Sequence, residues 1–184
     1  KDPQKELVDP AVLGTRTVLE TADAIPSVTR VVLTSSVAAI YGDAADIAEA
    51  PGGRLTEQVW NTTSSLDHQP YSYSKTLAER EAWRIADAQD RWRLVAINPS
   101  LVIGPSSGPQ PSSDSFAIVK RLGDGTMRVG APRLGMGVVD VRDVAQAHLA
   151  AAFLPDASGR NIVSGHETTI LEVGQALRER FGDR

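Results

Sequence analysis

"RVVLTSS", residues 30–36, is a short apolar run, rich in β-branched residues, that ends in hydroxyl side chains. A second run of this kind, "WRLVAINPS" at residues 92–100, ends in Asn98-Pro99-Ser100. Continuous apolar runs of this length predict strands that are buried on both faces of a parallel sheet. Ligands bind at the carboxyl ends of such strands in open α/β sheets. We therefore expect a site at the polar ends of these two strands.

Helical patterns alternate with the two runs. Residues 9–24 carry apolar side chains at roughly helical spacing, with Asp9 as the expected N-cap and Pro10 at the first helical position. Residues 71–90 predict a second helix, and residues 42–70 predict a long irregular loop of the kind that usually has a functional role. Strands that alternate with helices of this length predict an α/β fold built on a parallel sheet.

The composition excludes several classes of protein. The chain has 184 residues, 41% of them hydrophobic, and a net charge of −4, which suits one globular domain or most of one. It has no block of lysine and arginine for nucleic acid, no cysteine for disulfides, and no apolar run near the ~20 residues of a membrane span. The three histidines lack metal-ligand spacing, so no metal site is expected. We expect a soluble cytoplasmic protein without nucleic-acid or membrane partners.

Tyr71 and Lys75 form the chemically suggestive pair. They are four residues apart on a predicted helix, so their side chains share a face. A phenol has a pKa near 10, and an ammonium group within about 4–6 Å lowers that pKa by roughly 1–3 units. Such a tyrosine can exchange a proton with a carbonyl or alcohol oxygen, and Ser36 can hold the same oxygen from the strand end. A hydride would have to come from a cofactor, because no side chain supplies one.

Four segments, in order, carry a family resemblance. The segments "RVVLTSSVAAIYG", "YSYSKTLAEREAW", "INPSLVIGP" and "VVDVRDVAQAHLAA" resemble the extended short-chain dehydrogenase/reductases, and most of all the dihydroflavonol-4-reductase-like branch. The resemblance implies a Rossmann-like, doubly wound parallel sheet with a small C-terminal substrate domain. Residues 1–103 would be the C-terminal part of the NAD(P)-binding domain. Residues 104–184 would be a mixed substrate-binding region with returning Rossmann elements.

The resemblance also implies a role for each matching residue. Ser36 falls on the family's catalytic serine, Tyr71 on its catalytic tyrosine, and Lys75 on the lysine that binds the nicotinamide ribose and lowers the tyrosine pKa. Val37 and Tyr41 fall beside the substrate; plant members often have an asparagine at the position of Tyr41, which disfavours a flavonoid substrate. The implied cofactor-binding residues are Thr34, Ser35, Tyr71, Lys75, Pro99, Ser100 and Leu101.

The expected activity is NAD(P)H-dependent reduction of a small aldehyde or ketone, with NADP favoured over NAD, by a monomer or homodimer. One alternative is an NAD-dependent nucleotide-sugar epimerase or dehydratase, which the stretch "SKTLAE" and the lack of an acidic residue beside Ser36 disfavour. Another alternative is a non-catalytic NAD(P)-sensing or scaffold protein, which the intact Ser36, Tyr71 and Lys75 disfavour.

A glycine-rich motif is missing from the chain. Family members begin with a strand and a G-x-x-G-x-x-G turn that seats the pyrophosphate on a helix N-terminus, and the chain has no such motif. We therefore expect a fragment that lacks the N-terminal half of the nucleotide-binding sheet, together with the residues that choose NAD or NADP. On its own, such a fragment is expected to bind the cofactor weakly and to be inactive.

Overall fold

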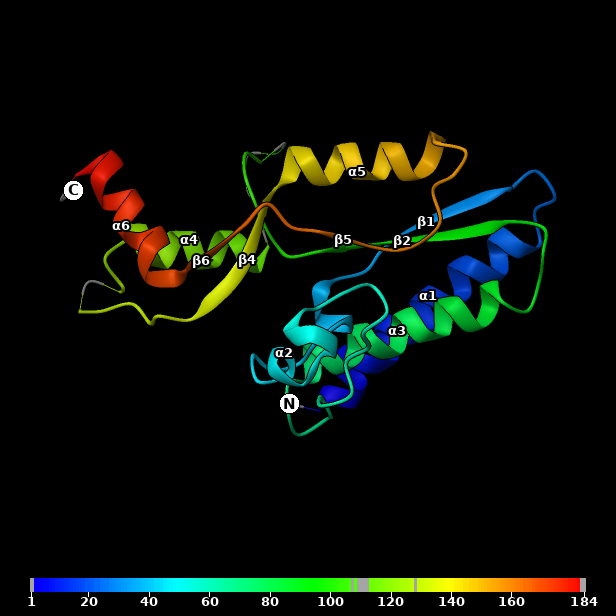
Figure 1. The fold of residues 1–184 in the computed structure, drawn as a ribbon, viewed down its shortest axis with the longest axis horizontal. Helices are drawn as coiled ribbons and strands as arrows, with labels where there is room; N and C mark the ends of the chain where they lie inside the picture. Colours follow the sequence, from blue (N-terminus) through cyan, green and yellow to red (C-terminus); the bar gives the residue numbers. More distant parts are fainter. Residues whose placement is uncertain (1, 107, 109–112, 128, 183–184) are drawn as a thin grey trace. The chain divides into compact units, whose positions relative to one another are not determined.

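The chain divides into two compact units. The structure, a computed structural model, describes residues 2–106, 108, 113–127 and 129–182. One unit comprises Lys1–Pro99 and Ala147–Ile162, and the other comprises Ser100–Gln146 and Val163–Arg184. Two three-stranded sheets, ordered β1-β2-β5 and β3-β4-β6, are formed by the described residues (Figure 1).

The first sheet carries both strands that the apolar runs predict. β1 (Arg30–Thr34) pairs in parallel with β2 (Arg93–Pro99), and β5 (Gly159–Val163) is the other neighbour of β2. This confirms the predicted parallel pair. β2 is buried along its length after Arg93, as expected for a central strand. The expectation that β1 is buried on both faces is wrong: its side chains are half-buried or exposed, because β1 is the edge strand of this sheet.

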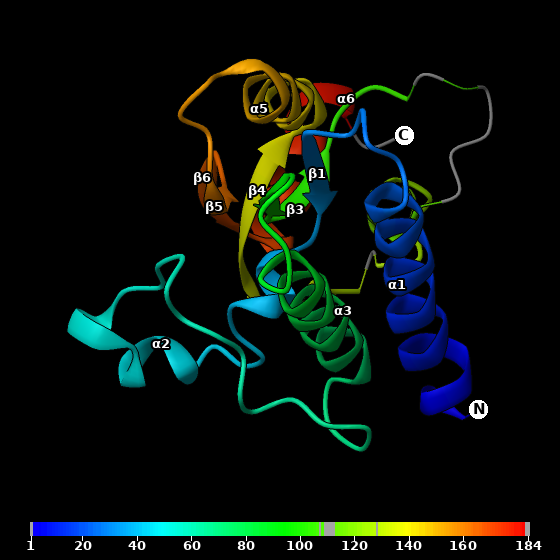
Figure 2. The ribbon, with the colours of Figure 1, turned by 90° about the vertical axis from the view of Figure 1, so that its right-hand side faces the viewer.

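Two helices pack side by side in the same unit (Figures 1 and 2). They are α1 (Asp9–Asp23) and α3 (Pro70–Ala86), and α3 ends four residues before the predicted boundary at residue 90. The apolar core beneath them includes Leu19, Ala82 and Trp92. This core fixes the rotation of α3, and therefore which of its side chains face the strand ends.

The start of α1 differs from the prediction. A π-helical turn, η1 (Gln4–Val8), runs directly into α1, so Val8 rather than Asp9 occupies the N-cap position. The Asp9 side chain instead accepts a 2.6 Å hydrogen bond from Nε2 of Gln4. Pro10 is consequently the second residue of α1, a place where its missing N–H is still tolerated.

The predicted loop 42–70 contains two short helices, α2 (Asp46–Glu49) and η3 (Pro51–Gly53), so it is less irregular than expected. The side chain of Asp46 closes one end of it by accepting hydrogen bonds from the backbone N–H groups of Gly42 and Asp43. At the other end Gln69 has φ 54°, the one positive φ among the described non-glycine residues. That left-handed residue turns the chain into α3, which begins at Pro70.

The second unit holds the sheet β3-β4-β6. β3 (Leu101–Ile103) is parallel to β4 (Gly135–Asp140), and β4 is antiparallel to β6 (His166–Thr169). The helices are α4 (Asp114–Gly123), α6 (Ile170–Phe181) and the start of α5 (Val141–Phe153). A Cβ at Gly137 of β4 would meet the Ser164 hydroxyl at 2.7 Å, so a larger residue there would displace that hydroxyl. Asp140, the residue before α5, caps this helix, since its Oδ1 accepts a hydrogen bond from the N–H of Arg142 at 2.8 Å.

Candidate active site

Ser36 lies at the turn that follows β1. Its backbone is still extended, and it caps a short 3-10 helix, η2 (Val37–Ala39), by accepting a 3.1 Å hydrogen bond from the N–H of Ala38 to its Oγ. That bond uses one acceptor position of the hydroxyl, so its O–H can still donate to another oxygen. The turn lies against α3, because the Thr76 hydroxyl donates to the Ala38 carbonyl at 3.4 Å.

Tyr71 and Lys75 stand one turn apart on α3, as their spacing predicts. Tyr71 is 53% exposed. Lys75 is half-buried. Burial lowers the pKa of the Lys75 ammonium, and the negative charge of Glu79, one further turn along α3, opposes that lowering.

Glu79 is a fully buried carboxylate that the sequence analysis missed. Its side chain is 0% exposed and is paired with Arg160, whose side chain is 7% exposed, at 2.6 Å between Oε1 and Nε. The other oxygen, Oε2, accepts hydrogen bonds from the Ser35 hydroxyl at 2.5 Å and from Nδ2 of Asn98 at 2.7 Å. The local signal for this residue was its place four positions after Lys75, but nothing in the sequence linked it to Arg160.

Arg160 reaches three more parts of the same unit. Its guanidinium donates to the backbone carbonyls of Val59 at 2.5 Å and Ala39 at 3.1 Å. It also stacks on the ring of Trp60, 3.7 Å from the ring centroid. One side chain therefore connects β5, the loop before α3, the end of η2 and the buried carboxylate.

The remaining sequence-predicted residues are distributed over both units. The Thr34 hydroxyl is exposed and lies 2.7 Å from Nε2 of His148, whereas the Ser35 hydroxyl is buried against Glu79. Val37 begins η2, and its carbonyl accepts a hydrogen bond from the N–H of Tyr41. The first unit thus brings together the Ser36 turn, the turn of α3 that carries Lys75, and the end of β2.

Pro99 is the last residue of β2 in the first unit, and Ser100 and Leu101 belong to the second unit. Leu101 is the first residue of β3. The Ser100 N–H donates to the Val163 carbonyl at 3.1 Å, and its side chain is buried. The family resemblance assigns cofactor binding to Pro99–Leu101, and the backbone of these residues would make that contact.

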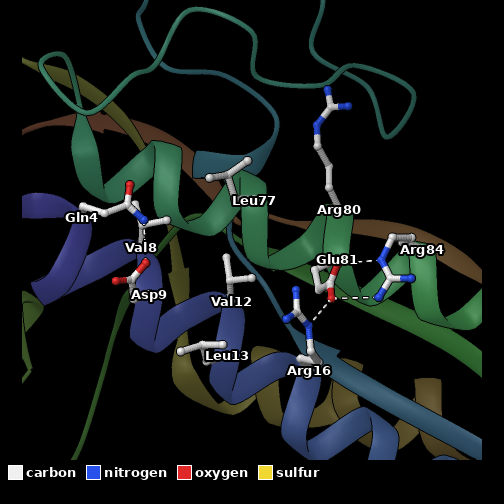
Figure 3. Close-up of a pocket in the computed structure, with 10 residues that line it drawn as sticks. All are labelled: Gln4, Val8, Asp9, Val12, Leu13, Arg16, Leu77, Arg80, Glu81 and Arg84. Atoms are coloured by element: carbon white, nitrogen blue, oxygen red, sulfur yellow. Dashed lines mark hydrogen bonds and ion pairs between the residues drawn. The ribbon is translucent and has the colours of Figure 1, made fainter.

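A surface groove elsewhere on the first unit contains none of the predicted site residues. It runs between α1 and α3, as Figure 3 shows, and is lined by Gln4, Val8, Asp9, Val12, Leu13, Arg16, Leu77, Arg80, Glu81 and Arg84. Arg84 and Arg16 both bond to Glu81 and lower its pKa to about 2. Glu81 is two residues beyond Glu79, about 200° around α3. The groove therefore lies on the other side of α3 from Glu79, beside α1, and this side is the outer face of α3.

The described part of the chain has neither a helix suited to spanning a membrane nor a cluster of side chains suited to holding a metal ion. None of the helices in residues 2–106, 108, 113–127 and 129–182 combines the length and apolarity needed to cross a membrane. The same residues contain no cluster of three or more His, Cys, Asp or Glu side chains arranged to hold a metal ion.

Several known proteins with similar sequence are described as reductases. A family model described as the NAD dependent epimerase/dehydratase family matches residues 2–179. Cinnamoyl-CoA reductase CAD2 of Medicago truncatula is 36% identical over 98% of this chain and 54% of that protein. The NADPH-dependent methylglyoxal reductase GRE2 of Saccharomyces cerevisiae is 34% identical over 98% of this chain and 56% of that protein. The chain thus spans about half the length of the curated relatives it matches.

A solved structure shows the same fold. The crystal structure of Gre2 from Candida albicans in complex with NADPH matches this chain with a TM-score of 0.87 and 33% sequence identity. The match covers 100% of this chain and 57% of the Gre2 chain. This similarity confirms the predicted Rossmann-like α/β fold.

Proposed function

This chain belongs to the NAD dependent epimerase/dehydratase family, and on that basis we propose that the protein carrying it is an NAD(P)H-dependent reductase of small aldehydes or ketones. The observation that carries the proposal is the pairing of an exposed Tyr71 with a half-buried Lys75 on one face of α3, next to the turn that holds Ser36. The relatives described as reductases of cinnamoyl-CoA and methylglyoxal support a carbonyl substrate.

The three side chains have complementary roles in the proposed reaction. Tyr71 gives its phenolic proton to the carbonyl oxygen as that oxygen gains negative charge. The Lys75 ammonium stabilises the phenolate that remains and binds the ribose hydroxyls. Ser36 donates its O–H to the same carbonyl oxygen and orients it. A bound nicotinamide supplies the hydride.

Buried atoms at the end of β2 fit a nicotinamide nucleotide. Within the described residues, Oδ1 of Asn98 and Oγ of Ser100 are buried and have no hydrogen-bond partner. Buried polar atoms of this kind are normally satisfied, so they suit a ligand that offers both donors and acceptors, as a carboxamide and a ribose do. We favour NADPH over NADH, because GRE2 is described as NADPH-dependent and the Candida Gre2 structure contains NADPH.

The two units take different parts in this proposal. The first unit, with β1, β2 and α3, supplies the proton-transfer residues and the Thr34–Ser35 strand end that passes the cofactor. Residues 104–184 are proposed to supply the substrate-binding region. Val37 and Tyr41, which follow Ser36, line the substrate.

The test is a comparison of Tyr71→Phe with the wild-type, full-length protein that carries this chain. NADPH oxidation is measured with a panel of aldehydes, ketones and nucleotide sugars. We expect wild-type turnover on an aldehyde or ketone, and a fall in kcat of about 10²–10⁴-fold in Tyr71→Phe with NADPH affinity little changed. Tyr73→Phe is the matched control, because Tyr73 lies off the Tyr71–Lys75 face, and it should keep its activity.

Three outcomes would contradict the proposal. Turnover that Tyr71→Phe leaves intact refutes the proton-transfer role. A wild-type protein that binds NADPH but turns over none of the compounds supports a non-catalytic sensing or scaffold protein, and turnover restricted to nucleotide sugars supports an epimerase or dehydratase.

A further inference from the structure

We propose that Glu79, held by Arg160, is a positioning residue for this reaction: it fixes the backbone of Ser36 against the helix that carries Tyr71 and Lys75. The inference rests on the proposed function for its catalytic consequence, but the positioning itself is a property of the chain. It concerns residues that lie outside the Ser36, Tyr71 and Lys75 set.

The burial of an ion pair here needs a reason. Removing two charges from water costs several kcal/mol per ion, and well-packed apolar residues often stabilise a core at least as well as a buried pair does. The Glu79 carboxylate is nevertheless 0% exposed, and each of its oxygens takes two donors. Oε1 accepts from Arg160 and from Nε1 of Trp83, and Oε2 accepts from Ser35 and Asn98. Four directional contacts on one carboxylate define a position more sharply than apolar packing does.

The carboxylate reaches Ser36 through Asn98. The two N–H protons of the Asn98 side-chain amide are both used: Nδ2 donates to Oε2 of Glu79 at 2.7 Å and to the backbone carbonyl of Ser36 at 3.1 Å. The same Oε2 takes the hydroxyl of Ser35, the preceding residue. Oε2 of Glu79 therefore holds Ser35 directly and the Ser36 carbonyl through Asn98. This fixes the Ser36 backbone, and the direction of the Ser36 hydroxyl follows from that backbone.

The same carboxylate fixes the helix. Tyr71, Lys75 and Glu79 follow each other at four-residue intervals on α3, so they form a row along one face. Because Glu79 is bonded to Ser35 after β1, to Asn98 of β2 and to Arg160 of β5, α3 cannot rotate about its axis or slide without breaking three hydrogen bonds. Its negative charge also faces the Lys75 ammonium and opposes the loss of the proton that burial favours. Ser36 and Tyr71 are the proposed hydrogen-bond partners of the substrate carbonyl oxygen. The Glu79 carboxylate thus fixes the positions of both.

Arg160 completes the arrangement from β5. Besides pairing with Glu79, it donates to the carbonyl of Ala39 at the end of η2, the short helix that Ser36 caps. It therefore fixes the Ser36 turn from the other end. Without Arg160, Glu79 would be a buried, unpaired charge and would lose its place.

The first measurement is independent of catalysis. In the full-length protein, Glu79→Gln keeps the shape of the side chain but presents an NH₂ group to donors, so either Arg160 or the Ser35–Asn98 pair loses its acceptor. We expect faster amide hydrogen exchange in residues 36–41 than in the wild type, with exchange in α1 unchanged. Glu81→Gln, the same substitution on the outer face of α3, is the matched control and should leave residues 36–41 at wild-type rates. Wild-type exchange in Glu79→Gln overturns the positioning, whatever the activity.

The second measurement is kinetic. We expect Glu79→Gln to lower kcat about 10- to 100-fold, as small displacements of catalytic groups do, with KM for NADPH changed less than about threefold. If Glu79 acts through Ser36, the two substitutions are not additive, and Glu79→Gln combined with Ser36→Ala is little slower than Ser36→Ala alone. A double variant whose losses multiply, or a Glu79→Gln protein with wild-type kcat, overturns the inference. Rates are expressed per NADPH-binding site, so that partial unfolding does not imitate a slower enzyme.

A second variant covers the case in which Glu79→Gln does not fold. Asn98→Leu removes the amide that links Glu79 to Ser36 but keeps the Glu79–Arg160 pair and a side chain of similar size. It should also speed exchange in residues 36–41 and lower kcat; normal values for both would refute the link. A wild-type enzyme without turnover would refute the proposed function alone, because the exchange measurements still decide whether Glu79 positions Ser36.

Discussion

The two faces of α3 carry glutamates in opposite surroundings. Glu79 and Glu81 are two residues apart, about 200° around the helix, and each is bound by arginine. Glu79 and its arginine are almost completely withdrawn from water. Glu81 is bound by Arg16 and Arg84, whose side chains are 43% and 62% exposed, in the groove beside α1 (Figure 3). One residue type on one helix therefore forms a buried polar network on one side and, on the other, ion pairs in which the glutamate side chain is 10% exposed but both arginines reach solvent.

The difference shows where a charge constrains structure. On the outer face water competes for every partner of Glu81, so its ion pairs contribute little and tolerate movement. On the inner face Glu79 has no alternative to its protein partners, so breaking any contact leaves a buried group unsatisfied. The inner face is also the one that carries Tyr71 and Lys75.

The largest effect is expected from Arg160→Met in the full-length protein. This change leaves the Glu79 carboxylate buried without its counter-ion, and loss of one partner of a buried pair costs about 3–5 kcal/mol of unfolding free energy. Urea unfolding measures the loss. Combining Glu79→Leu with Arg160→Met removes both charges and should recover part of it. An Arg160→Met protein of wild-type stability would mean that the two faces of α3 do not differ as described.

An intermediate effect is expected at Trp60, whose ring contacts an arginine from each environment. Arg160 stacks at 3.7 Å from the centroid on the buried side, and the exposed Arg80 lies at 4.7 Å. A desolvated cation–π contact is worth about 2 kcal/mol and an exposed one about 0.5–1 kcal/mol. Trp60→Leu should therefore cost about 2 kcal/mol or more in urea unfolding, and Arg80→Met less than about 1 kcal/mol. Equal losses in the two variants would remove the contrast.

The smallest effect is expected from Glu81→Gln, and it depends on pH. Because Arg84 and Arg16 lower the pKa of Glu81 from 4.5 to about 2, the stabilisation is fully present above about pH 4.5 and is lost as the pH falls towards 2. Water screens the two exposed arginines, so we expect only about 1 kcal/mol at pH 7. Unfolding of the wild type and Glu81→Gln at a series of pH values should show the two curves converging in this window. A difference in unfolding free energy between the two proteins that persists at pH 2, or that 1 M salt leaves unchanged, would contradict ion pairs with solvent-exposed arginines.

Local sequence patterns predicted the elements but not their surroundings. The apolar run of β2 marked a buried strand correctly, whereas the similar run of β1 overstated its burial, because the position of a strand within its sheet is not encoded in the strand itself. Asp9-Pro10 has the composition of a helix start, yet the π-helical turn before it displaced the cap. Both errors arise where a neighbouring segment decides the outcome.

The candidate site shows the same division. Tyr71 and Lys75 were found because their four-residue spacing is a local feature of one helix. Glu79 shares that spacing, but its partner Arg160 is 81 positions away on β5, and no periodic pattern connects the two. The polar network behind the site therefore became visible only with the tertiary structure.

The span between Glu79 and Arg160 has a consequence for synthesis of the chain. At roughly 5–20 residues per second, a ribosome needs roughly 4–16 seconds to cover the 81 positions from Glu79 to Arg160. Through that interval α3, β1 and β2 exist without the guanidinium that neutralises their central carboxylate. The nascent first unit must keep Glu79 hydrated, and the enclosed form can close only when β5 arrives. The helix that carries Tyr71 and Lys75 is thus made before the strand that carries Arg160, the partner of its buried carboxylate.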